Sequence, residues 1–322
     1  MSLDAVKGMN IDQVIEYYGN HPQSRDRTFF MYYDEEGGFR EVSFGRFLEM
    51  SLDYARMIDS LRRRQGREWD GRFHVGFYMQ NTPEVLYAFG GCAFTNATLV
   101  GINNAQVGQR LATDIKNMDV NVLFVDEVEQ PKSGRTFLES VMGAHRDHNL
   151  SPLYPEYVIA RKRQQRNHPA QVATIGEMLE VGSGTDFSPT PLEQERAGVI
   201  IFTSGTTGTP KGIEVPWKKV FDVGVMSTTV LNYGEDDVYP RPVERRQAPF
   251  EKEIQRQQFC KGHRAGGSHR LEQCGRPGDV CVEHGWRRCR LCPPASENRD
   301  QHRNQRPQPK GLHPDLRAGY LH

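Results

Sequence analysis

"IIFTSGTTGTPKGIEV" spans residues 200–215 and decides how the rest of the chain is interpreted. An apolar run leads into Gly205, Gly208 and Gly212, which are interleaved with hydroxyl side chains and a single lysine. Glycines have no Cβ, so the backbone of such a loop can approach a ligand closely. Its N–H groups then form a concavity that binds anions. With hydroxyls, one cation and no carboxylate, the loop suits a polyphosphate.

The loop is not the phosphate-binding loop of the P-loop nucleotide hydrolases. That pattern requires Gly-Lys followed by Ser or Thr and then by a helix. Here Pro210 precedes Lys211, Gly212 follows it, and residues 213–215 favour a strand. The phosphate-binding hypothesis therefore stands without that fold.

The region around the loop alternates strands with helices. Short apolar runs with strand character and stretches with helical spacing follow one another along the body of the chain. This alternation predicts an α/β domain with a largely parallel sheet. The expected strands are 74–79, 97–102, 120–126, 156–160 and 197–203, and the expected helices begin at 83, 107 and 217.

Several reactive or charged side chains in the body have simpler explanations. We expect Cys92 to be a reduced, buried apolar residue and not a nucleophile. The basic runs 60–68 and 161–168 are interpreted as solvated charges. No apolar run approaches the roughly 18 residues that a membrane helix needs, and no signal peptide is recognisable at the start. We therefore expect a cytoplasmic location, peripheral to membranes at most.

The last quarter of the chain differs from the body in charge and pattern. Residues 241–322 carry 17 basic and 9 acidic side chains, whereas residues 1–240 carry 24 basic and 32 acidic ones. The tail has only 11 Ile, Leu, Val, Phe and Met among its 82 residues and keeps no strand or helix period. Such a segment buries too little apolar surface to offset the entropy of ordering it. We expect a basic, disordered tail.

The loop resembles the signature of the adenylate-forming superfamily, which includes acyl-CoA synthetases, luciferase and the adenylation domains of peptide synthetases. Residues 203–212 satisfy every position of that pattern. The segments 43–58 and 81–126 resemble the first helical and βαβαβ parts of the same enzymes. The stretch "GINNAQVGQRLATDI" at 101–115 is closer to the fatty-acyl and carnitine-type CoA ligases than to the peptide-synthetase branch.

The resemblance implies a layered α/β large N-terminal domain and a two-step ligase. The co-substrates and cofactors would be ATP, Mg²⁺ and coenzyme A, and the partner a small carboxylic acid such as a fatty acyl chain. The loop residues implied to bind the nucleotide are Thr203, Ser204, Gly205, Thr206, Thr207, Gly208, Thr209, Pro210, Lys211 and Gly212.

The resemblance covers residues 25 to about 239 and then stops. Residues 240–322 contain no aromatic-His segment, no Tyr-Gly-x-Thr-Glu motif, no recognisable ribose-binding Asp and no catalytic-Lys domain. We therefore expect domain limits of 1–239 and 240–322, an incomplete large domain and weak or no ligase activity. No catalytic residue is assigned.

Three interpretations of the tail remain open. In the first, the tail is translated out of frame; in the second, it is a zinc-binding appendage; in the third, it is a disordered arm that binds nucleic acid. The cysteines at 260, 274, 281, 289 and 292 lack the usual second close pair of a zinc site, so no metal ligand is assigned. Sparse aromatic residues and scattered arginines argue against nucleic acid as a partner. The alternative function is a non-enzymatic pseudoenzyme that binds nucleotide or zinc.

Overall fold

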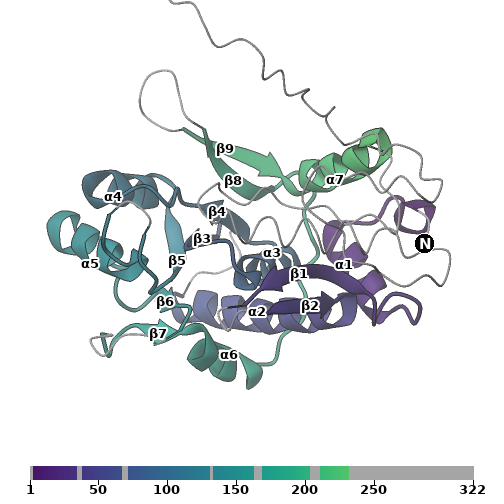
Figure 1. The fold of residues 1–322 in the computed structure, drawn as a ribbon, viewed down its shortest axis with the longest axis horizontal. Coiled ribbons are helices and arrows are strands. Elements are labelled where there is room, and N and C mark those ends of the chain that lie inside the picture. Colours follow the sequence, from purple (N-terminus) through teal and green to yellow (C-terminus); the bar gives the residue numbers. More distant parts are fainter. Residues whose placement is uncertain are drawn as a thin grey trace, which may run out of the picture. The chain divides into compact units, whose positions relative to one another are not determined.

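The computed structural model describes residues 3–34, 38–66, 72–130, 133–162, 169–203 and 211–231. All of them belong to one unit, Met1–Asp237, and Figure 1 shows its elements in chain order. The helices and strands are η1 (Leu3–Val6), α1 (Ile11–Asn20), β1 (Thr28–Tyr33), β2 (Phe39–Ser43), α2 (Phe44–Arg64), β3 (His74–Tyr78), α3 (Pro83–Thr95), β4 (Thr98–Gly101), α4 (Gly108–Asn117), β5 (Val120–Val125), α5 (Phe137–His148), β6 (Val158–Ala160), β7 (Ala173–Thr174), α6 (Ile175–Ser183), β8 (Ala197–Thr203), β9 (Lys211–Pro216) and α7 (Trp217–Leu231).

Within the described residues, seven strands form the main sheet in the order β7-β6-β5-β3-β4-β8-β9. Every neighbouring pair is parallel except β8 and β9, which are antiparallel. The strands β1 and β2 form a separate antiparallel hairpin. The chain places β4 on one side of β3 and β5 on the other, so the strand order reverses at β3. The expected α/β fold with a largely parallel sheet is confirmed.

The centre of the sheet is apolar on both faces, as a parallel sheet covered by helices requires. All six residues of β5 are buried, and so are the three residues of β6. The helix α2 packs on α3 and α6, and α4 packs on α5. Figure 1 shows α4 and α5 beside β5, while α2 and α6 lie together below the sheet in that view. Cys92 of α3 is fully buried and free, as expected.

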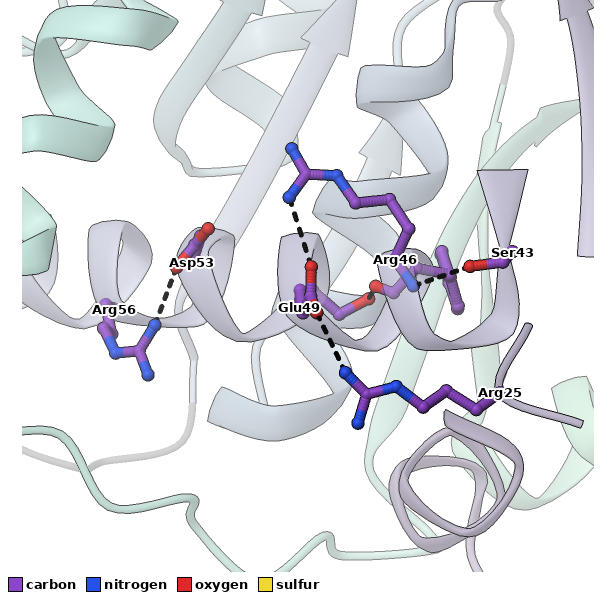
Figure 2. A network of polar contacts seen from close by, with 8 residues as sticks. Arg25, Ser43, Arg46, Glu49, Asp53 and Arg56 are labelled. Carbon is purple, nitrogen blue, oxygen red and sulfur yellow. Dashed lines mark hydrogen bonds and ion pairs between the residues drawn. The ribbon is translucent and has the colours of Figure 1, made fainter. Parts of the chain in front are cut away.

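The long helix α2 begins with a polar cap. Arg46 N–H donates to the Ser43 side chain at 3.1 Å, which satisfies one of the helix's first N–H groups. Glu49 lies between two arginines, 3.3 Å from Arg46 Nη1 and 3.6 Å from Arg25 Nη2 (Figure 2). These side chains are exposed, so the ion pairs contribute little stability and mark the helix surface, not a site.

No helix in the described ranges is long and apolar enough to cross a membrane. The predicted strands and helices of the body all appear, with ends that differ by a few residues. The predicted boundary at 239 and the tail 240–322 lie outside the described residues. The location in the cell stays a prediction.

Candidate nucleotide-binding site

The parallel strands end together at one edge of the sheet. Because β3, β4, β5, β6 and β8 run in the same direction, their carboxyl ends lie along that edge. In open α/β sheets this is the edge at which ligands bind. Thr203 is the last residue of β8 and so stands at this edge. The candidate loop begins there.

The hairpin β8–β9 carries the candidate loop at its tip. Thr203 and Lys211 are direct partners in the antiparallel register, and the chain between them is residues 204–210. The ladder continues through Phe202 opposite Gly212 and Ile201 opposite Ile213. The two ends of the loop are therefore held side by side by strand pairing. A hydroxyl and an ammonium group flank its entrance.

The structure describes three of the ten predicted nucleotide-binding residues. Thr203 and Lys211 are exposed, and Gly212 is half-buried. The exposed hydroxyl and ammonium groups are chemically suited to phosphate oxygens. The remaining predicted residues, Ser204, Gly205, Thr206, Thr207, Gly208, Thr209 and Pro210, lie outside the described residues.

A buried ion cluster lies at the same edge, where β5 and β6 end. Arg161 Nε is 3.3 Å from Asp126 Oδ2, and Arg161 Nη1 is 3.8 Å from Glu84 Oε1 in the first turn of α3. Asp126 is 1% exposed and the Arg161 side chain 8%. Burial raises the pKa of Asp126, while the Arg161 charge opposes that rise. The cluster ties three elements together at the carboxyl edge.

Two predictions about basic runs are wrong in part. Arg161 is the first residue of the run 161–168, which was expected to be solvated, yet its side chain is buried among carboxylates. Residues 163–168 lie outside the described residues. Arg62, in the run 60–68, is 8% exposed and is paired with Asp59. Both arginines are buried beside a carboxylate. The partner of Arg62 lies three residues earlier in α2, whereas the partners of Arg161 are distant in the sequence.

A second buried polar group fixes two loops near the ends of β3 and β4. The Gln130 amide N–H donates to Asn104 O at 2.9 Å and also to the Tyr78 hydroxyl, which in turn donates to Gln106 O. The Ser140 hydroxyl donates to Gln130 Oε1 at 2.5 Å. Gln130 is 2% exposed. Sequence patterns gave no signal for this residue, because it lies in a polar stretch that predicts a solvated loop.

The described residues contain no group of three or more His, Cys, Asp or Glu side chains that is placed to hold a metal ion. The cysteines between 260 and 292 lie outside those residues, so the zinc hypothesis stays a prediction. Among the described residues of the predicted loop, Thr203 and Lys211 carry side chains of the chemistry that binds phosphate.

The fold and the hairpin define an α/β domain with a Thr- and Gly-rich loop at the carboxyl edge of its sheet. The chain belongs to the AMP-binding enzyme family, whose model matches residues 20–242.

Two curated relatives illustrate the similarity. The chain is 30% identical over 186 residues to a steroid-22-oyl-CoA synthetase of Rhodococcus jostii (strain RHA1), covering 56% of this chain and 28% of the relative. It is 27% identical over 255 residues to a crotonobetaine/carnitine–CoA ligase of Salmonella paratyphi A (strain ATCC 9150 / SARB42), covering 74% of this chain and 42% of the relative. The chain therefore spans less than half the length of these relatives.

A solved structure shares the fold. An acyl-CoA synthetase of Brucella canis superposes with a TM-score of 0.54 at 16% identity, covering 71% of this chain and 38% of that chain. At this identity the match supports the fold alone.

Proposed function

We propose that this chain binds ATP·Mg²⁺ through residues 203–212 and forms the nucleotide-binding part of an ATP-dependent acid–CoA ligase. The observation that carries the proposal is the register pair of Thr203 and Lys211, which holds both ends of a complete signature loop at the carboxyl edge of the sheet. Membership of the AMP-binding family supports the same activity.

Each part of the loop would have a distinct role toward the triphosphate. The hydroxyls of Thr203, Ser204, Thr206 and Thr207 would donate to the β- and γ-phosphate oxygens, together with the backbone N–H groups of Gly205 and Gly208. Lys211 would stabilise the negative charge that develops on the departing pyrophosphate. Bound Mg²⁺ would neutralise phosphate charge and orient the chain of phosphates.

The reaction proposed for the whole ligase has two steps. A carboxylate oxygen attacks the α-phosphorus, the bond from that phosphorus to the bridging oxygen breaks, and pyrophosphate leaves with the charge. The thiolate of coenzyme A then attacks the carbonyl carbon of the acyl-adenylate, and AMP leaves as the thioester forms. The thiol proton passes to solvent. No catalytic residue for the second step is assigned among the described residues.

The proposed substrate class is a carboxylic acid with an apolar or cationic body. The names of the two curated relatives point to a steroid acid in one and to crotonobetaine or carnitine in the other. Both reactions join an acid to coenzyme A, so the acid–thiol chemistry is the shared feature. We propose fatty and similar acyl chains as the first substrates to assay by acid-dependent exchange of pyrophosphate with ATP.

The direct test is calorimetric titration of the full chain with ATP in the presence of Mg²⁺. The substitution Lys211→Ala should weaken binding about tenfold or more, because a hydrogen bond to a charged phosphate contributes about 1.5–3 kcal/mol. The matched control is Lys219→Ala, which removes an exposed lysine that pairs with Asp222 in α7 at 3.7 Å. That control should leave the affinity unchanged. Equal losses in the two variants would contradict a specific role for Lys211.

A further inference from the structure

Gly212, assigned by its motif to the nucleotide, lies against a methionine from another part of the fold. A Cβ atom built at Gly212 would lie 2.5 Å from Met118 Sδ and 3.1 Å from Met118 Cε. It would also lie 3.0 Å from Ile200 Cγ2. These distances are shorter than van der Waals contact, so any side chain at 212 would displace the thioether.

Space, and not backbone conformation, explains the glycine at this position. Gly212 lies within the regular strand β9 and is paired with Phe202. Its backbone is outside the left-handed region, unlike that of Gly108 or Gly134, whose φ angles are 57° and 64°. An alanine could therefore adopt this conformation without strain. What it would lack is room, because Met118 fills it.

The backbone of Met118 is itself held by two hydrogen bonds. Its N–H donates to Asp114 O at 3.2 Å at the end of α4. Its carbonyl oxygen lies 2.5 Å from His74 Nδ1 at the start of β3. Because a carbonyl only accepts, Nδ1 must carry the hydrogen, which both the neutral and the charged ring allow. Asp119 follows with a φ of 43° and turns the chain into β5.

Met118 therefore connects the end of α4 and the start of β3 to the strand β9 that follows the loop. His74 and Asp114 anchor the backbone of Met118, and the side chain of Met118 reaches the strand at Gly212. Gly212 is bonded to Lys211, which stands opposite Thr203 at the end of the hairpin. Methionine suits such a contact because its unbranched side chain fills irregular gaps against backbone.

We propose that Met118 is a positioning residue for the nucleotide-binding loop, which packs its thioether against Gly212 and thereby fixes the position of Lys211 at the start of β9. This role rests on the proposed function, because its effect on the loop is measured as ATP·Mg²⁺ affinity. The packing of Met118 against Gly212 is measured separately, as a change in Tm.

A double-mutant cycle on the full chain tests the contact. Gly212→Ala should lower Tm by about 5 °C, because the new methyl group overlaps Met118. The same substitution in a Met118→Ala background should cost less than half of that, because the smaller side chain leaves space for the methyl group. The control is Gly176→Ala in α6, where a Cβ atom meets nothing within 4 Å. Equal Tm losses from Gly212→Ala in both backgrounds would overturn the contact.

ATP·Mg²⁺ affinity separates positioning from mere stability. Gly212→Ala and Met118→Ala should each weaken binding about fivefold or more, and the double variant should bind better than Gly212→Ala alone. Met178→Ala removes a buried side chain of α6 and lowers Tm without touching the hairpin, so it should leave affinity unchanged. If the hairpin variants lose no more affinity than Met178→Ala, Met118 does not position the loop. If the wild-type chain binds no ATP, the proposed function falls with it, and the Tm cycle still decides the contact.

Discussion

Arg161 and Asp126 form a buried ion pair across the carboxyl ends of β6 and β5, with Arg161 Nε 3.3 Å from Asp126 Oδ2. Taking two charges out of water is costly, and removing one partner leaves the other charge buried without compensation. Glu84 adds a second carboxylate 3.8 Å from the same guanidinium. Arg161 therefore compensates the charge of two carboxylates at this edge of the sheet.

Replacing Arg161 with an apolar side chain should be strongly destabilising. We expect Arg161→Met to lower the free energy of unfolding by about 3 kcal/mol, measured by urea denaturation. The control is Arg56→Ala, which breaks the half-exposed pair of Arg56 Nη1 and Asp53 Oδ1, which are 2.7 Å apart; Figure 2 shows this pair on α2. That half-exposed pair should contribute less than about 1 kcal/mol. Adding Asp126→Asn to Arg161→Met should recover part of the loss, and a variant no less stable than the control would contradict the account.

Asp114 should make the fold more stable as the pH falls toward mild acidity. Its side chain is buried and its Oδ2 atom has no hydrogen-bond partner. Burial raises the pKa of Asp114 above 3.8, and the Arg110 charge opposes the rise. The folded state therefore takes up the proton at a higher pH than the unfolded state does. It follows that this residue costs stability at neutral pH and costs less as the pH falls through the folded-state pKa.

The variant Asp114→Asn isolates that contribution. At pH 7 it should be more stable than the wild type by on the order of 1 kcal/mol, because it has the same size without the charge. The difference between the two should shrink as the pH falls from 7 to about 4, which denaturation curves at several pH values would show. A difference that grows on acidification has the wrong sign and would count against burial as the cause.

The sequence pattern predicted the sheet well because each strand is a short apolar run. The run 120–126 became β5, all of it buried, and 197–203 became β8 without change. Arg161 was misjudged because a basic residue in a charged run is usually solvated, and its partner Asp126 is distant in the sequence. One signal was available: Asp126 directly follows a buried strand, at the edge where parallel strands bind ligands.

Gly212 illustrates a different limit of motif reasoning. The sequence correctly predicts a strand on each side of the loop. A motif, however, does not distinguish a glycine that approaches a ligand from one that approaches a neighbouring side chain. Met118 lies far from the loop in sequence, and only the fold brings its sulfur under the strand. The β1–β2 hairpin was likewise not predicted from the sequence. Its strands are largely exposed or half-buried, and buried and exposed residues do not alternate cleanly along them.

The base of the loop hairpin should be intolerant of a side chain at Gly198. A Cβ atom there would lie 2.5 Å from Cδ2 of the buried Trp217 ring, which also packs on Phe89 at 5.4 Å between centroids. We expect Gly198→Ala to lower the free energy of unfolding by about 2 kcal/mol through overpacking. Gly184→Ala, where a Cβ atom meets nothing within 4 Å, serves as control in the same denaturation series. Similar stability in the two variants would refute a packing role for Gly198.

The outer strand of the sheet should promote self-association of the isolated chain. Among the described strands, β9 pairs only with β8, and the cross-strand partners Ile201 and Ile213 are 53% and 49% exposed. Edge strands with apolar side chains template pairing with other chains. We expect the double substitution Ile201→Lys and Ile213→Lys to raise the monomeric fraction in sedimentation velocity. Val181→Lys on α6 is the control, and a wild-type chain that is already monodisperse would contradict the expectation.

Residues 203–212 are proposed to contact the triphosphate of ATP. The most direct test is hydrogen–deuterium exchange of the full chain with and without ATP·Mg²⁺, read by mass spectrometry at the peptides that span this loop. We predict slower exchange at residues 203–212 on ATP addition, with smaller effects at β9 and no effect at α6. Unchanged exchange in the loop at saturating ATP, or protection confined to other segments, would contradict the claim.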